Sequence, residues 1–340
     1  MPELTLGGKS LLRTPTYRAI LLCATFLIFS GAAAQGQQAK HKTERFRVKG
    51  FLQTRLTNVG GSSGNKSSTQ LQATRLRPTM TYDFDAHFRA NAQINLTTRG
   101  RPLWSVTGRD VYLEYHNTGF AIRAGQSKVP FGYEIYQEGD EIRAALERAR
   151  VLSVLFPDER EFGLFFSSTA KNSRGPVYAA AATNGEAINT RETGVGKNFS
   201  LRAVFPLQRN QTIGASLYTG ASHAVGGASR VKQAFGVEYR GHYRQWSAQF
   251  EYLWGRQGGS NLNGGYGQAV YAARRSGNVF VRHDIFDPNT SVGNDMWNRT
   301  SIGWYKDFGL LRATAEYDIA KNERTPTGDN TFGIQIQLRY

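Results

Sequence analysis

The last ten residues of the chain, 331–340, alternate strictly between apolar and polar side chains. The apolar positions are Phe332, Ile334, Ile336, Leu338 and Tyr340. Period-two alternation predicts a β-strand with one apolar and one wet face. Here the pattern runs to the final residue, although chain termini of water-soluble domains commonly fray. A strand that closes a membrane β-barrel has this pattern, with its terminal aromatic residue in the interfacial girdle.

Four further segments repeat the alternation, at residues 45–56, 86–97, 245–254 and 311–319. None of them places a charged side chain on its apolar face. Their lengths suit the ~9–11 residues that a tilted strand needs to cross a membrane. A soluble β-sandwich or β-helix would also alternate. Soluble sheets seldom keep the apolar face so aromatic at both strand ends, so the pattern favours a membrane barrel.

Short turns and longer polar connections alternate along the chain, as they do in outer-membrane barrels. Short turns are expected near residues 83–85, 117–119, 171–176, 206–210, 241–242, 273–277 and 307–309. Longer connections are expected at residues 58–68, 98–108, 126–159, 185–196, 221–230, 256–265, 287–297 and 320–330. The sequence therefore predicts an all-β fold, a transmembrane antiparallel β-barrel of about 16 strands with both termini on the periplasmic side.

The N-terminal segment has the three parts of a secretory signal peptide. Lys9, Arg13 and Arg18 precede an apolar run at residues 19–34, which ends in three alanines before Gln35. We expect residues 1–34 to be a signal peptide and residues 35–340 to form the barrel. The run is short for a retained membrane anchor, which is the alternative. The single cysteine, Cys23, lies in this segment, so we expect no disulfide, thiolate metal site or cofactor in the mature chain.

The chain is strongly basic, with a net charge of +16 from 42 Lys and Arg against 26 Asp and Glu. Removing Glu3, Lys9, Arg13 and Arg18 with the signal peptide leaves +14. Such a charge often marks a nucleic-acid partner, but an exported protein rarely meets nucleic acid. We therefore expect the charges to line the lumen or the loops of the barrel, and we expect no nucleic-acid partner.

The connection at residues 126–159 is far too long for an ordinary loop. Residues 140–152 within it have a helix-like pattern that includes Arg143, Glu147, Arg148 and Arg150. A barrel of about 16 strands encloses an aqueous lumen. We expect this connection to fold into the lumen and to act as its constriction loop.

Four motifs in and beyond this connection resemble one known family. Residues 123–134 read RAGQSKVPFGYE, and residues 145–150 read ALERAR. Residues 155–163 read LFPDEREFG, and residues 281–289 read VRHDIFDPN. Together, and in this order, they resemble the phosphate-selective porin O and P family of bacterial outer-membrane channels. The resemblance implies a sixteen-stranded, usually trimeric barrel with an inward loop and basic residues along the pore.

Strand phasing and the resemblance give a set of basic residues that we expect to line an anion path. Phasing contributes Arg45, Arg47, Lys49, Arg55, Arg75, Arg77, Arg89 and Arg123. The loop region matched by the resemblance contributes Lys128, Arg148, Arg150 and Arg160. Guanidinium forks suit the oxygens of phosphate and carboxylate groups. Phasing also points five acidic residues into the lumen. If they pair with the arginines, the positive field in the lumen is weaker. The acidic residues are Glu114, Glu238, Glu251, Glu316 and Asp318.

These features predict an outer-membrane porin, an anion-preferring channel through which small solutes such as phosphate diffuse passively. Its expected surroundings are outer-membrane lipid and small anions, in a homotrimer in the bacterial outer membrane. One alternative is a general or sugar-passing porin with weak ion selectivity, which would need aromatic side chains in the lumen. The strand alternation places three aromatic side chains on the lumen face, those of Phe51, Tyr112 and Tyr218.

The second alternative is a hydrolase embedded in a barrel. The sequence contains no G-x-S-x-G, H-E-x-x-H or P-loop motif, and its six histidines are scattered. No serine, cysteine or threonine lies at a sequence spacing from a histidine that is typical of a catalytic nucleophile and its general base. We therefore expect no catalytic residues and no enzyme activity.

Overall fold

The computed structural model describes residues 5–6, 9–10, 45–60, 68–98, 105–168, 175–185, 188–190, 192, 196–208, 210–222, 230–323 and 330–340. The chain divides into two units, residues 1–44 and 45–340. In the first unit, β1 (Thr5–Leu6) pairs with β2 (Lys9–Ser10). The rest of the predicted signal peptide, residues 1–34, lies outside the described residues.

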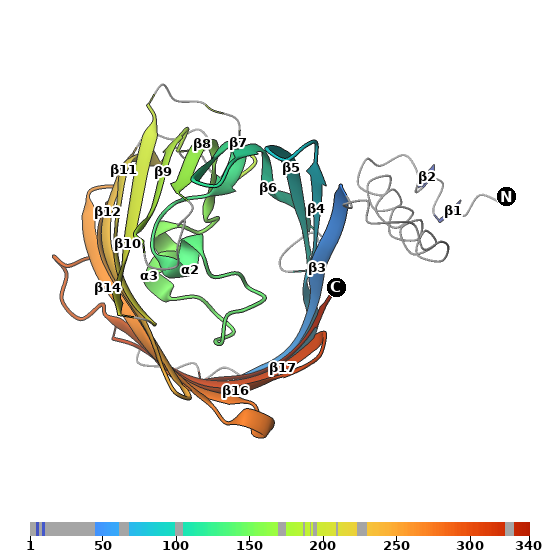
Figure 1. Cartoon of the computed structure of the whole chain (residues 1–340). Coiled ribbons are helices and arrows are strands. Elements are labelled where there is room, and N and C mark those ends of the chain that lie inside the picture. Colours follow the sequence, from blue (N-terminus) through green and yellow to red (C-terminus); the bar gives the residue numbers. More distant parts are fainter. Residues whose placement is uncertain are drawn as a thin grey trace. The chain divides into compact units, whose positions relative to one another are not determined.

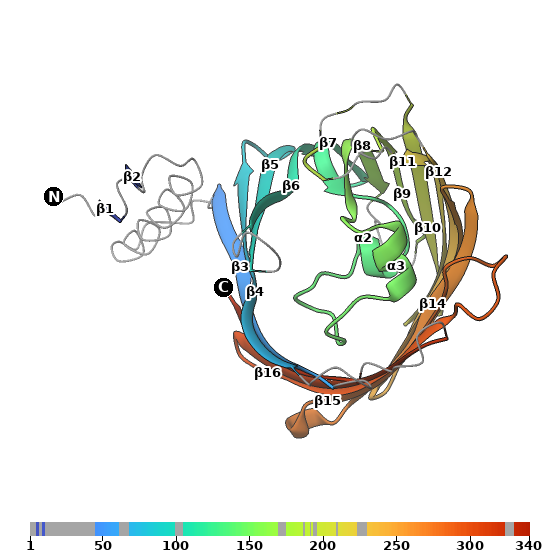
Figure 2. The same ribbon diagram turned by 180° about the vertical axis from the view of Figure 1, so that it is seen from behind.

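The second unit is a closed antiparallel barrel (Figures 1 and 2), as the alternation predicted. Its sixteen strands are β3 (Phe46–Val59), β4 (Ser68–Asp83), β5 (Phe88–Thr97), β6 (Ser105–His116), β7 (Phe120–Lys128), β8 (Arg160–Ser168), β9 (Val177–Thr183), β10 (Asn198–Gln208), β11 (Gln211–Ser222), β12 (Arg230–Tyr243), β13 (Trp246–Gln257), β14 (Ser260–Ala272), β15 (Asn278–Asp287), β16 (Trp297–Phe308), β17 (Leu311–Asn322) and β18 (Thr331–Arg339). Among the described residues, no helix is long and apolar enough to cross a membrane.

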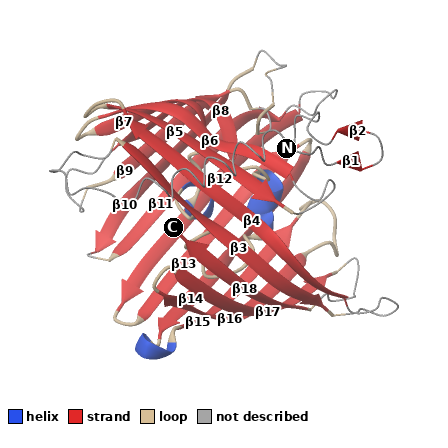
Figure 3. Ribbon diagram, turned by 90° about the vertical axis from the view of Figure 1, so that its right-hand side faces the viewer, coloured by secondary structure: helices blue, strands red, loops and turns tan. Residues whose placement is uncertain are grey.

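The strand faces follow the sequence pattern. On β18, Ile334 and Ile336 are exposed on the outer wall, whereas Gln335 and Gln337 are buried on the lumen side. Water in the lumen solvates polar side chains, and lipid accepts the apolar ones, so the two-residue period of a strand sorts them automatically. Figure 3 shows the strands tilted across the wall, as closure of a barrel requires.

Tyr340, which follows β18, takes part in the seam of the barrel. Tyr340 and Gly50 of β3 exchange two backbone hydrogen bonds, with N···O distances of 2.8 and 3.0 Å. A Cβ atom at Gly50 would lie 2.8 Å from the Tyr340 hydroxyl and 2.4 Å from the Arg77 carbonyl oxygen. The terminal ring therefore lies across a glycine that leaves room for it, which closes β18 against β3.

The connection between β13 and β14 differs from the prediction. Residues 256–265 were expected to form a long connection, but the structure has only Gly258 and Gly259 between the two strands. Both glycines have positive φ angles, 62° and 99°, which a tight turn needs. The polar residues on either side, such as Arg256 and Asn261, extend the strands, and their polarity imitates a loop.

The turn expected at residues 241–242 lies a little further along the chain, at residues 244–245 between β12 and β13. Gly241 stays within β12 and pairs with Ala248. The turn therefore contains Arg244, whose φ angle is 54°, rather than the glycine on which the prediction rested. The pairing of β12 with β13 continues past Gly241, and its last residue pair before the turn is Tyr243 and Trp246.

Candidate functional site in the lumen

The lumen loop, residues 129–159, connects β7 to β8 and lies inside the ring of strands (Figures 1 and 2). It contains two short helices, α2 (Tyr133–Tyr136) and α3 (Arg150–Leu155). The inward fold of the predicted constriction loop is thus confirmed. The predicted helix at residues 140–152 is wrong, because residues 140–149 are irregular and only the last part of the stretch is helical.

The root of the lumen loop, defined as residues 129–138 and 149–156, packs on the wall formed by β11–β15. Phe131 and Phe156 lie with ring centroids 4.8 Å apart, and Phe156 meets Tyr218 of β11 edge-on at 5.2 Å. Leu152 and Leu155 complete a buried apolar cluster with the wall. This packing removes the root from water and fixes it in place by the hydrophobic effect.

Wall glycines make room for the root. A Cβ atom at Gly236 of β12 would lie 3.0 Å from the Phe131 ring. A Cβ atom at Gly255 of β13 would lie 2.9 Å from a methyl carbon of Leu155. These positions therefore act as sockets for two apolar side chains of the root.

Ion pairs beneath the root are balanced in charge. Arg282 of β15 contacts Glu134 at 2.8 Å and Asp284 at 2.9 Å, and Arg299 of β16 contacts Asp284 at 3.1 Å. Beside them, Arg202 of β10 donates to Glu238 of β12 at 2.5 and 2.9 Å. Three arginines thus face three carboxylates. Glu251 adds a further carboxyl group, which accepts a hydrogen bond from the Glu134 amide at 3.2 Å.

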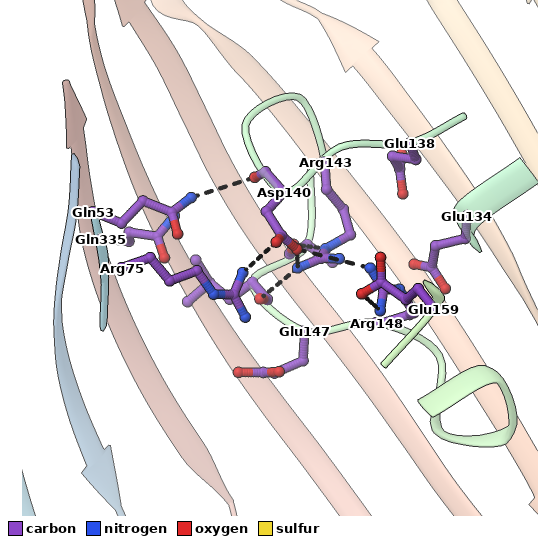
Figure 4. Close-up of polar contacts among 12 residues, drawn as sticks. Gln53, Arg75, Glu134, Glu138, Asp140, Arg143, Glu147, Arg148, Glu159 and Gln335 are labelled. Carbon is purple, nitrogen blue, oxygen red and sulfur yellow. Dashed lines mark hydrogen bonds and ion pairs between the residues drawn. The ribbon is translucent and has the colours of Figure 1, made fainter. Parts of the chain in front are cut away.

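The tip of the lumen loop, residues 139–148, is different because arginines gather around one carboxylate. Figure 4 shows Asp140 at the centre of this group. The distances from a guanidinium nitrogen to a carboxylate oxygen of Asp140 are 2.9 Å for Arg75, 2.7 Å for Arg77, 3.1 Å for Arg143 and 3.8 Å for Arg148. Burial opposes ionisation of Asp140, but the surrounding guanidinium groups outweigh it and hold its pKa well below the usual value.

Wall side chains also bind the backbone of the tip. The Leu146 amide donates to Glu316 of β17 at 2.6 Å, and the Leu146 carbonyl oxygen accepts from Arg55 of β3 at 3.0 Å. The carbonyl oxygens of Ile142 and Glu141 accept from Arg312 and Gln337. These groups replace the partners that a helix would have provided, which explains why the predicted helix does not form.

A second arginine group lies at the base of the loop, near the start of β8. Glu159 pairs with Arg148, with Arg160 at 3.0 Å and with Arg109 of β6 at 3.3 Å. Arg160 also contacts Asp110 at 2.9 Å. Burial opposes ionisation of Glu159, but Arg148 and the other arginines lower its pKa below the usual value.

The two groups give the tip and base a positive excess. They contain six arginines against three carboxylates, and the tip adds Glu141 and Glu147, of which Glu147 pairs with Arg55 of β3, so the formal net charge is +2. The arginines are Arg75, Arg77, Arg109, Arg143, Arg148 and Arg160, and the carboxylates are Asp110, Asp140 and Glu159. Arg75, Arg109 and Arg148 keep part of their side chains exposed, at 19%, 12% and 10%.

Glu138, the residue of the root next to the tip, has an unusual environment. Its carboxyl group is buried, and within the described part of the chain its Oε2 has no hydrogen-bond partner. Burial, and then the nearby Glu134 carboxylate, raise the pKa of Glu138 to about 7, against the opposing effect of Arg143.

The remaining predicted residues lie along the short-turn end of the lumen or beside the loop. Arg47 and Arg89 both contact Asp83, and Arg123 contacts Glu114 at 2.6 Å. Lys128 donates to the Glu138 carbonyl oxygen at 3.0 Å. Lys49 is an exposed residue of β3. Arg45 immediately precedes β3, and the Arg150 guanidinium lies over the Trp297 ring, 6.0 Å from its centre.

Sequence reasoning missed the arginines outside the simple alternation. Arg109 and Asp110 lie at a bulge in β6, where the pairing with β5 shifts between Ala92 and Ile94. A bulge inserts one extra residue and reverses the facing of the residues beyond it, so phasing failed there. Arg143 was visible in the helix-like stretch, but its role depends on Asp140, which no local pattern indicates. Among the described residues, no cluster of three or more histidine, cysteine, aspartate or glutamate side chains is arranged to hold a metal ion.

Comparison with known proteins agrees with this geometry. The family model for phosphate-selective porin O and P matches residues 46–240, more than half of the chain. A search of curated proteins finds no significant match.

Solved structures share the fold at low sequence identity. OmpT of Vibrio cholerae in its trimer form has a TM-score of 0.67 and 11% identity, and the alignment covers 87% of this chain and 99% of that one. An anion-selective porin from Comamonas acidovorans has a TM-score of 0.65 and 13% identity, with the same coverage. OmpF of Salmonella typhi, in complex with daunomycin, has a TM-score of 0.64 and 10% identity, over 87% and 97% of the two chains.

The closed barrel and the family match together define an outer-membrane porin, a barrel that forms a channel. Within that class, the chain belongs to the phosphate-selective porin O and P family.

Proposed function

We propose that this porin is an anion-preferring channel for the passive diffusion of small solutes, including oxyanions of the size of phosphate. The observation that carries the proposal is the excess of positive charge at the tip and base of the lumen loop, where arginines outnumber carboxylates. The ion pairs beneath the root are balanced, so they do not cancel this excess.

The excess acts where a permeating ion passes. The tip reaches across the lumen to β3, β4 and β17, so ions must pass close to it. Charges act over roughly 8 Å at physiological salt, so the arginines of the tip act on an ion that passes beside them. Partly exposed arginines such as Arg75 and Arg109 can therefore attract an anion and pass it on without holding it tightly.

The inward aromatic residues support ion passage better than sugar passage. Phe51 and Tyr218 point into the lumen but are buried, at 4% and 2% exposure. The Arg77 guanidinium lies 5.2 Å from the Phe51 ring, and the Lys232 ammonium lies 4.7 Å from the Tyr218 ring. Tyr112 likewise faces Arg123 at 5.0 Å. These rings stack on cations instead of presenting free faces to sugars.

We further propose that the channel assembles as a homotrimer. The support is the family membership and the fold shared with OmpT of Vibrio cholerae, whose solved structure is a trimer form. Native mass spectrometry of detergent-solubilised protein measures the subunit number directly. A mass of three chains is expected, and a monomer under conditions that preserve channel activity would contradict this part of the proposal.

The zero-current potential of the channel in a planar bilayer tests the ion preference. Under a KCl gradient, its sign should show that chloride is more permeant than potassium. The preference should weaken at high salt, where charges are screened. Adding phosphate should reduce the chloride current if phosphate pauses at the arginine forks. A channel that prefers potassium would overturn the proposal while leaving the barrel fold intact.

A further inference from the structure

The short-turn ends of β12–β16 carry a group of cations on one sector of the rim, here called the basic rim. It consists of Arg244 in the β12–β13 turn, Arg274 and Arg275 in the β14–β15 turn, and Lys306 near the end of β16. Arg274 and Arg275 begin the 3₁₀ turn η2 (Arg274–Ser276), the helical turn drawn below β14 and β15 in Figure 3. All three arginines are exposed.

The basic rim is interleaved with aromatic side chains of the outer wall. Trp246 and Tyr271 lie with ring centroids 4.9 Å apart just above the two turns. The Trp304 indole N–H donates to the Ser276 carbonyl oxygen at 2.7 Å and so fixes η2 against β16. Tryptophan and tyrosine mark the level at which a membrane protein meets the headgroups. The four cations therefore lie at headgroup level.

The cations of the basic rim have no carboxylate partner among the described residues. The nearest acidic residue in the chain is Asp307, and its carboxylate pairs with Arg312 at 2.9 Å and Arg339 at 2.5 Å. The sector therefore keeps its full positive charge. The opposite sector differs: its described turns, residues 84–87 and 117–119, contain Asp85 and no lysine or arginine.

Backbone geometry gives an independent reason to regard the rim arginines as functional. Arg244 has a φ angle of 54°, and Arg274 has a φ angle of 45°. Glycine or asparagine adopts this left-handed conformation with less strain than arginine does. A chain that keeps arginine in both turns accepts a small cost in stability for the side chain that it gains there.

We propose that the basic rim binds the phosphate groups of anionic phospholipids in the periplasmic leaflet of the outer membrane. Short turns face the periplasm in outer-membrane barrels, so the rim meets that leaflet. Clustered arginines beside interfacial aromatic residues attract anionic headgroups, and the guanidinium forks match phosphodiester oxygens. The basic rim thus fixes one sector of the barrel in the lipid, independently of ion passage through the lumen.

The test compares lipid binding by the intact porin and by variants. Native mass spectrometry measures bound phosphatidylglycerol and phosphatidylcholine for the wild type, for the triple variant Arg244→Gln, Arg274→Gln and Arg275→Gln, and for Arg256→Gln. Arg256 is an exposed arginine at the other end of β13 and serves as the matched control. Each lost charge should weaken phosphatidylglycerol binding roughly fivefold.

The triple variant should therefore bind phosphatidylglycerol about a hundredfold more weakly than the wild type, and Arg256→Gln should bind it within twofold. Inorganic phosphate at millimolar concentration should not displace the lipid. Quenching of Trp246 and Trp304 by brominated phosphatidylglycerol gives a second measurement, which should exceed quenching by brominated phosphatidylcholine. Equal binding by wild type and triple variant, equal loss in the Arg256→Gln control, or equal quenching by the two lipids would overturn the proposal.

Discussion

The root and the tip of the lumen loop are held to the wall in opposite ways. The root is fixed by apolar side chains that fill sockets at Gly236 and Gly255, with balanced ion pairs beneath them. The tip is fixed mainly by ion pairs and hydrogen bonds, with a small apolar contact of Ala144 and Ala145 on Phe280, and arginines outnumber carboxylates around Asp140. Apolar packing is insensitive to salt and pH, whereas ion pairs depend on both. We therefore propose that the root holds the loop inside the barrel and that the charge of the tip sets the ion preference of the channel.

The largest expected effect comes from breaking the root. Phe131 is fully buried between Phe156 and the wall at Gly236. Phe131→Ala should reduce the free energy of unfolding by about 3–5 kcal/mol, because it empties a packed socket. Single-channel conductance should rise as the loop loosens. Urea unfolding in lipid vesicles and bilayer recordings measure the two effects.

Phe199→Ala serves as the control, because Phe199 is 56% exposed on the outer face of β10. It should change stability far less and leave conductance unchanged. A folded Phe131→Ala variant with wild-type conductance would show that the apolar root does not hold the loop.

Breaking the tip should have a smaller effect on stability and a larger one on selectivity. Asp140→Asn removes the carboxylate shared by four guanidinium groups, and the freed arginines repel one another. The tip can relax toward water, so the loss of stability should stay below that of Phe131→Ala. The formal charge of the group rises by one, and the chloride preference in bilayer recordings should increase. A decreased preference would mean that Asp140 does not neutralise the arginines in the wild type.

Acidification distinguishes the two regions further through Glu138. The pKa of Glu138 is about 7 in the folded protein against 4.5 as the ordinary value, so the folded state binds the proton more tightly. Stability should therefore fall as pH rises from about 4.5 to about 7 and then level off. Asp140 has the opposite shift, and its ion pairs are lost only in stronger acid, below its ordinary pKa of 3.8.

Glu138→Gln should remove the contribution of Glu138 to this dependence, since glutamine cannot ionise. Unfolding free energies at pH 5 and pH 8 provide the measurement: the variant should lose less stability between the two pH values than the wild type does. The same slope in wild type and variant would assign the titration to another group.

The wall of the barrel could be predicted from sequence because the facing of a strand residue depends only on local alternation. Residues 331–340 and 245–254 illustrate this, and their observed faces agree with their patterns. The prediction failed at Arg109, where a bulge in β6 interrupts the alternation. It also failed at residues 256–265, where polar strand ends imitate a loop.

The interior of the lumen was harder to predict because its contacts join distant parts of the chain. Residues 140–149 have a helical pattern, yet their backbone partners include Arg55, Glu316 and Gln337. Those partners lie on strands that local periodicity cannot place beside the loop. For the same reason, the sequence indicated that arginines would line the lumen but did not indicate which carboxylates they would face.

Moving one charge at a time tests most directly whether the tip sets ion preference. Arg75 contacts Asp140 at the tip. Arg240 of β12 points into the lumen on the side of the root, with its guanidinium 3.8 Å from the centre of the Tyr133 ring. The zero-current potential of Arg75→Gln and Arg240→Gln channels should be measured under the same KCl gradient. The chloride preference should fall clearly in Arg75→Gln and little in Arg240→Gln, whereas an equal or reversed order would contradict the account.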